Sequence, residues 1–148
     1  VEKVILPALR AGKTVITDRF DSSTFAFQVY AERFPESESL FEECRKIVMH
    51  KCMPDAYIIL DLPADVAQKR RSANPVKKEV FFDEKPLAYH KRARLGFKKF
   101  ARGRRLLPSA PSALSCLRHA KVFFVDANRR PEEVHEDIMN IVHKQLVS

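Results

Sequence analysis

The stretch Thr14-Val-Ile-Thr-Asp18-Arg19-Phe20-Asp-Ser-Ser23-Thr24-Phe-Ala-Phe27-Gln28 carries most of the information in this chain. Its β-branched opening predicts a buried strand over about 14–18. The Asp-Ser-Ser that follows offers N-cap side chains for a helix over about 22–33. Asp18 and Arg19 would then stand at the carboxyl end of a strand, where open α/β sheets bind their ligands.

The remaining sequence alternates between helical and strand patterns. Short apolar runs predict strands over about 56–61 and 121–126. Helices are predicted over about 1–10 (with Gly12 as its stop), 36–53, 63–72 (with Pro63 as first helical residue), 86–102 and 131–147. One apolar side of the helix over 36–53 would consist of Leu40, Phe41, Cys44, Ile47 and Val48. Strands that alternate with helices indicate parallel βαβ units and an α/β fold.

Composition describes a globular chain of one domain. Its 148 residues are 45% hydrophobic and 31% charged, and no apolar run approaches the length of a membrane span. The amino-terminal residues do not resemble a signal peptide, and the three cysteines form no CxxC pair. These features predict reduced thiols in a cytoplasmic protein without a membrane partner.

The net charge of +8 is concentrated in one part of the chain. Residues 69–105 hold 14 of the 27 basic residues and three acidic ones, a local net charge of +11. Such a block marks either a site for an anion or a solvated helix face. Nucleic acid and a polyphosphate are both candidate partners, and the position of the block after a strand–helix unit favours the polyphosphate through the family resemblance described below.

No phosphate-cradling loop is found in the sequence. Gly12-Lys13-Thr14 resembles the end of a P-loop, but position 7, where the first glycine should stand, is Pro7. A P-loop also follows a strand, whereas Gly12 precedes one in our assignment. Since Val1 is not an initiator methionine and the first residues already suggest a helix, we expect the chain to begin inside a longer protein.

Four segments, in this order, resemble the thymidylate kinase family. They are the Asp18-Arg19-Phe20 stretch with its Ser/Thr-rich helix start and Gln28, residues 54–71 (PDAYIILDLPADVAQKRR), residues 87–97 (LAYHKRARLGF) and residues 122–128 (VFFVDAN). Each segment alone is a weak signal, but together they span nearly the whole chain. The resemblance therefore covers the later two-thirds of such an enzyme.

The resemblance implies a single domain over 1–148 with the three-layer parallel α/β fold of P-loop nucleotide kinases, incomplete because its first strand and P-loop are absent. It implies transfer of the γ-phosphoryl group of ATP to dTMP, giving dTDP and ADP, with Mg²⁺. It also implies a homodimer at full length. The 148 residues by themselves should be inactive, because they lack the anion nest of the P-loop.

By the same resemblance, the first motif binds the acceptor nucleotide. Arg19 would contact the phosphate of dTMP, and Asp18 would help to position Mg²⁺ or that phosphate. Phe20 would pack against the sugar. Ser23, Thr24 and Gln28 share one side of the predicted helix, and the hydroxyl and amide groups suit the edge of a thymine ring. N-cap chemistry is the alternative role for Ser23, while Phe25 and Phe27 are expected in the core.

Cations further along the chain are candidates for the ATP side. Arg70 and Arg71 are expected to act on the transferring phosphoryl group, with Lys77 and Lys78 in a lid-like insert over 73–85. Asn128 and Arg129 would lie beside the adenine. A solvated basic loop and a turn before Pro131 are the corresponding structural alternatives.

Two other functions remain open from the sequence. The chain could belong to another nucleotide or deoxynucleoside kinase of the same superfamily, although the helix with Thr24 and Gln28 favours a monophosphate acceptor. It could also be a degenerate, non-catalytic module that binds nucleotides or RNA. A P-loop encoded upstream of Val1 would distinguish the enzyme from the module.

Overall fold

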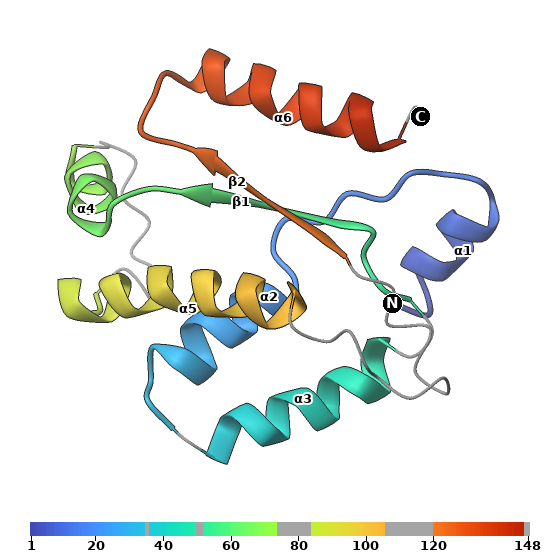
Figure 1. The fold of residues 1–148 in the computed structure, drawn as a ribbon, viewed down its shortest axis with the longest axis horizontal. Coiled ribbons are helices and arrows are strands. Elements are labelled where there is room, and N and C mark those ends of the chain that lie inside the picture. Colours follow the sequence, from blue (N-terminus) through green and yellow to red (C-terminus); the bar gives the residue numbers. More distant parts are fainter. Residues whose placement is uncertain (35, 50–51, 74–83, 106–119, 147–148) are drawn as a thin grey trace.

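The computed structural model describes residues 1–34, 36–49, 52–73, 84–105 and 120–146. Two strands, β1 (Ala56–Asp61) and β2 (Lys121–Asp126), pair in parallel, with Ala56 opposite Lys121 and Asp61 opposite Asp126. Figure 1 shows helix α6 on one face of this small sheet and helix α5 on the other. The predicted strands over 56–61 and 121–126, their parallel arrangement and the α/β class are therefore confirmed.

Helices account for most of the described chain. Their bounds are α1 (Ile5–Arg10), α2 (Asp21–Ser23), η1 (Thr24–Tyr30), α3 (Glu36–Met49), α4 (Ala64–Ser72), α5 (Leu87–Arg105) and α6 (Pro131–Leu146). The helix predicted over 22–33 is a short α-helix that continues as a π-helix, η1. Pro63 is the N-cap residue of α4, and the helix begins at Ala64, one residue later than predicted.

Helix α1 ends as the sequence predicts. Gly12 has a φ of 71°, a left-handed conformation that glycine adopts without strain. The N–H of Gly12 donates to the carbonyl of Leu9, and the N–H of Lys13 donates to that of Ala8. This is the Schellman pattern of a helix C-terminus, so Gly12 is a helix stop here and not part of a P-loop.

The strand predicted over 14–18 is wrong. Residues 13–17 form no helix or strand, and the side chain of Ile16 is 84% exposed. β-branched residues favour an extended backbone, but a strand also needs a neighbour that pairs with its N–H and C=O groups. Within the described part of the chain, the sheet consists of β1 and β2 only.

The contact between η1 and α5 positions the rest of the core. Gly96 on α5 faces η1 so closely that an added Cβ would lie 2.9 Å from the Cα of Ala26. Beside this contact, Phe25 packs on Phe100 with ring centroids 5.8 Å apart, and Tyr57 of β1 meets the same ring at 5.3 Å. One aromatic cluster thus joins η1, α5 and the sheet.

We predict that Gly96→Ala destabilises the protein. Alanine normally stabilises a helix interior relative to glycine by about 0.8–1 kcal/mol. Here the new methyl group would meet backbone atoms of η1, so the two helices must separate. Overpacking of this kind costs about 1–3 kcal/mol in the free energy of unfolding.

Urea denaturation of the two proteins would measure the difference. Leu95→Ala is the matched control, because this neighbouring side chain on α5 is exposed. An unfolding free energy of Gly96→Ala equal to or above that of the parent protein would contradict the close contact.

Candidate functional site

A cavity of about 540 Å³ opens between η1 and α3. We call it the η1–α3 cavity. It is lined by Arg19, Phe20, Asp21, Ser23, Thr24, Phe27, Gln28, Phe41, Cys44, Arg45, Val48 and Met49. Five of these, namely Arg19, Phe20, Ser23, Thr24 and Gln28, are the residues predicted to bind the acceptor nucleotide. The structure therefore brings the predicted acceptor residues together around one space.

Helix η1 separates its side chains into two sets. Phe25, Ala26 and Val29 point into the core and are buried. Thr24 and Gln28 are exposed and line the cavity on the other side. Residues four apart remain neighbours on such a helix, so the hydroxyl and the amide face the same space, as the sequence predicts.

Arg19 has an unusual backbone conformation, with a φ of 65°. This left-handed region is uncommon for a residue with a Cβ, and such strain gathers at functional sites. The guanidinium carbon lies 5.6 Å from the ring centroid of Phe27, a cation–π distance. Phe27 packs against the buried cluster of Ala31, Tyr89 and Ala93, as expected of a core residue, and its half-buried ring also lines the cavity beside Arg19.

Asp18 lies next to Arg19 but outside the cavity lining, and it is exposed. Among the described residues, no group of three or more His, Cys, Asp or Glu side chains could hold a metal ion. Mg²⁺ commonly binds through one or two carboxylates together with water and substrate phosphates. A single exposed carboxylate such as that of Asp18 is compatible with this mode of binding.

Asp21 was predicted as an N-cap residue, but Phe20 holds that position and no side chain caps α2. The carboxylate of Asp21 instead forms a buried network at the cavity wall with Arg45 and Tyr57, which the sequence did not single out. Arg45 of α3 is 5% exposed, and its Nε donates to Oδ2 of Asp21 at 2.5 Å. The hydroxyl of Tyr57 donates to Oδ1 of the same carboxylate at 2.8 Å. Burial, followed by the charge of Asp21, raises the pKa of Tyr57. We call these three residues the Asp21 network.

The Asp21 network also corrects the predicted apolar side of α3. Phe41, Arg45 and Met49 are the buried residues of this helix, whereas Leu40, Ile47 and Val48 are exposed. Arg45 is not among the residues predicted for the apolar side of this helix. Burying its charge without a partner would be costly. The carboxylate of Asp21 removes that cost, and only the tertiary structure brings it to Arg45.

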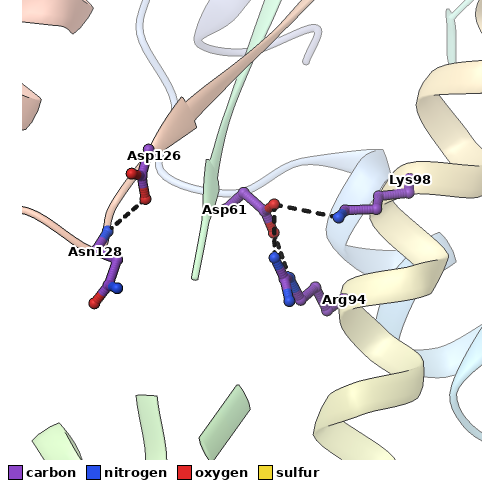
Figure 2. A network of polar contacts seen from close by, with 5 residues as sticks. All are labelled: Asp61, Arg94, Lys98, Asp126 and Asn128. Carbon is purple, nitrogen blue, oxygen red and sulfur yellow. Dashed lines mark hydrogen bonds and ion pairs between the residues drawn. The ribbon is translucent and has the colours of Figure 1, made fainter. Parts of the chain in front are cut away.

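A second polar network lies at the carboxyl ends of the strands (Figure 2). Asp61 at the end of β1 accepts two bonds from Arg94, at 2.5 and 2.9 Å, and Lys98 lies 3.3 Å from the same carboxylate. The bond from Arg94 holds the pKa of Asp61 below its ordinary value, against the opposing effect of partial burial. The neighbouring Asp126 of β2 accepts the backbone N–H of Asn128 at 2.9 Å.

The predicted ATP-side residues that the structure describes lie near this edge. Arg70 of α4 donates to the carbonyl of Ala127 at 2.9 Å, which joins the helix to the loop after β2. Asn128 in that loop is exposed, and Arg129 pairs with Asp137 of α6. Arg71 is half-buried on α4. Lys77, Lys78 and most of the lid-like insert over 73–85 lie outside the described residues.

We predict that the Asp61–Arg94 pair stabilises the fold only above the acid range. The folded-state pKa of Asp61 is below the ordinary 3.8, so the contribution is present above that value and is lost as the pH falls through the lowered pKa. Because the side chains are partly exposed, Arg94→Met should cost about 1 kcal/mol at pH 7.

Denaturation of parent, Arg94→Met, Asp61→Asn and the double variant at pH 7 and at pH 2.5 would test this. At pH 7 the double-mutant cycle should show coupling between the two residues, and at pH 2.5 the coupling should shrink. Equal coupling at both pH values would show that the pair is not ionic.

The fold is a parallel α/β arrangement, and its cavity, into which the side chains of Arg19, Thr24 and Gln28 also project, has mostly apolar walls. Comparison with known proteins makes the assignment specific. The family model for thymidylate kinase matches residues 1–138. The chain therefore belongs to the thymidylate kinase family, and family membership implies the P-loop kinase fold.

Relatives agree with this assignment. Thymidylate kinase of Chlamydia pneumoniae is 38% identical over 104 aligned positions, which cover 68% of this chain and 48% of that protein. Thymidylate kinase of Nitratidesulfovibrio vulgaris is 31% identical, covering 99% of this chain and 63% of its own length. That of Maridesulfovibrio salexigens is 28% identical, covering 93% and 58%. The chain thus spans about half to two-thirds of these relatives.

None of the helices in the described ranges combines the length and the apolar character that crossing a bilayer requires.

Proposed function

We propose that the protein to which these residues belong transfers the γ-phosphoryl group of ATP to dTMP, giving dTDP and ADP. The observation that carries this proposal is the η1–α3 cavity, in which a strained arginine and a hydroxyl–amide pair face one space. A planar guanidinium suits phosphate oxygens, and Thr24 and Gln28 suit the N–H and carbonyl groups of a thymine edge. Family membership supports the same reaction.

Within this proposal, Arg19 binds the acceptor phosphate. Its guanidinium rests on the ring of Phe27, and no ion pair to a carboxylate is found for it among the described residues. Its charge is thus available to an anion, which it can hold through two parallel hydrogen bonds. Phe20, which also lines the cavity, would pack against the sugar.

For the ATP side, we propose that the loop of Asn128 and Arg129 lies beside the adenine and that Arg70, next to that loop, acts on the transferring phosphoryl group. The bond from Arg70 to Ala127 supports this, because it places helix α4 against that loop. Arg71, Lys77 and Lys78 remain the proposed cations for the phosphates and the lid. Mg²⁺ would neutralise charge that develops on the phosphoryl oxygens, and Asp18 is the residue proposed to hold one of its waters.

The reaction also requires an anion nest for the ATP phosphates, and the 148 residues contain no P-loop sequence. We therefore propose that the active enzyme carries a P-loop outside these residues. We further propose that the full-length enzyme is a homodimer, because α3 exposes the apolar side chains of Leu40, Ile47 and Val48. The free thiols of Cys44 and Cys52 support a reducing, cytoplasmic location.

We predict that Arg19→Ala in the full-length protein lowers kcat/KM for dTMP at least about tenfold to a hundredfold. The variant removes a charge-assisted contact to the phosphate, and each such bond contributes about 1.5–3 kcal/mol. A decade in rate corresponds to about 1.4 kcal/mol. Arg33→Ala is a suitable control, since this residue also has a positive φ but does not line the cavity.

Thr24→Val and Gln28→Leu should instead weaken the choice among bases. A site that hydrogen-bonds a polar edge rejects rings that lack it, and the apolar variants lose this discrimination. The measurement is kcat/KM for dTMP, dUMP, dCMP and dGMP in the parent and the two variants. An unchanged base ranking would mean that the two residues do not read the base.

The alternatives give different results in the same assays. A deoxynucleoside kinase would phosphorylate thymidine in preference to dTMP. A non-catalytic module would bind a nucleotide without turnover even at full length. The outcome that would reject the phosphate assignment is an Arg19→Ala variant with the kcat/KM of the parent.

The purified 148-residue chain should show no ADP release with dTMP and Mg-ATP in a coupled assay. Without a P-loop, nothing in the sequence supplies the backbone nest that cradles the β- and γ-phosphates. The full-length protein assayed under the same conditions is the control. Turnover by the 148 residues alone would contradict the need for a P-loop outside them.

A further inference from the structure

The Asp21 network connects the wall of the η1–α3 cavity to the sheet. Asp21 and Arg45 line the η1–α3 cavity, whereas Tyr57 lies on β1 and is not part of that lining. The side chains of Arg45 and Asp21 are only 3% and 8% exposed. One carboxylate thus joins three elements: the start of the α2–η1 helix, α3 and the sheet.

We propose that the Asp21 network is a positioning device of the acceptor site, in which Tyr57 and Arg45 hold Asp21 and thereby fix Ser23 and Thr24 toward the nucleotide. This inference rests on the proposed function. It adds a role for Arg45 and Tyr57, which no sequence motif singled out, and a new role for Asp21, which the sequence predicted only as an N-cap residue. The three residues act through one carboxylate, so loss of any single contact should loosen the same cavity wall.

The geometry of the carboxylate supports a positioning role. Asp21 stands at the first position of α2, and Thr24, the first residue of η1, follows one turn later. Each of its oxygens has its own donor, Arg45 on Oδ2 and Tyr57 on Oδ1. Two donors from different elements fix both the position and the rotation of the carboxylate. The helix start that carries Ser23 and Thr24 therefore cannot shift without breaking a buried bond.

The guanidinium of Arg45 is fixed in turn by contacts other than the carboxylate. Its central carbon lies 5.8 Å from the ring centroid of Phe100 on α5, and one of its terminal nitrogens lies 4.0 Å from the sulfur of Met53. Since Phe100 also belongs to the aromatic core that seats η1 on α5, the network connects the cavity wall to the most buried part of the fold. Buried ion pairs are retained for this kind of specificity in some proteins, although they add little net stability.

Tyr57→Phe is the sharpest test, because it removes one hydroxyl outside the cavity lining and leaves the aromatic packing on Phe100 in place. In the full-length protein, we expect KM for dTMP to rise about three- to tenfold, which corresponds to about 0.7–1.4 kcal/mol in binding. KM for ATP should stay within a factor of two, and kcat should change less than KM for dTMP. Tyr30→Phe is the matched control, since this tyrosine of η1 lies outside the cavity lining.

A second pair of variants separates positioning from stability. Arg45→Met alone leaves a buried carboxylate without its ion-pair partner and should destabilise the fold. Asp21→Leu with Arg45→Met replaces the pair by apolar groups and should recover most of the lost stability. If the network positions the site, the double variant is stable but still has a raised KM for dTMP.

Four outcomes decide between the possibilities. A raised KM for dTMP in both Tyr57→Phe and the stable double variant, with KM for ATP unchanged, supports the proposal. Reduced stability with the parent's KM for dTMP would show a purely structural role and overturn it. Equal rises in both KM values would also overturn it. A parent protein that does not phosphorylate dTMP would reject the proposed function itself, and this inference with it.

Discussion

The close approach of α5 to η1 is the contact on which the rest of this structure depends. Gly96 has no side chain, and the backbone of Ala26 occupies the space where one would be. With the two helices this close, Phe25 and Phe100 meet in the core and Tyr57 of β1 completes the cluster. The residues on the opposite side of η1 are then left facing α3, and the cavity that receives the acceptor in our proposal forms between them.

Charge is distributed over the structure in two different ways. At the carboxyl edge of the sheet, Asp61 pairs with Arg94 and Lys98 in a partly exposed network, where each bond contributes little and salt or acid can weaken it. In the cavity wall, the side chains of Asp21 and Arg45 are buried, and burying either charge without the other would be costly. Arg19 differs from both, because its described contact is an aromatic ring. The available positive charge of the cavity therefore lies on Arg19, the residue predicted to bind the phosphate.

The sequence-based predictions agree with the structure for features that depend only on residues close together in the chain. The helix stop at Gly12, the two parallel strands and the gathering of Thr24 and Gln28 on one helical side follow from φ preferences, alternation and helical spacing. The predictions fall short for features that depend on contact with residues far away in the sequence. Residues 14–17 have the composition of a strand, but a strand also needs a paired neighbour. Phe27 packs on the core as the sequence predicts, but its contact with Arg19 and its place in the cavity lining could not be read from the sequence.

By itself, the sequence determined the α/β class and the family, because these depend on short motifs and on the periodicity of single elements. It also predicted a set of acceptor residues, of which Arg19, Phe20, Ser23, Thr24 and Gln28 line one cavity. It could not determine the buried side of α3. Hydrophobic periodicity assigns Arg45 to solvent, and only the fold brings the carboxylate of Asp21 within 2.5 Å of it. The pairing of Asp61 with Arg94, 33 residues apart, was equally beyond a local pattern. In both cases an electrostatic partner distant in sequence outweighs the preference of the single residue, and the tertiary structure alone supplies that partner.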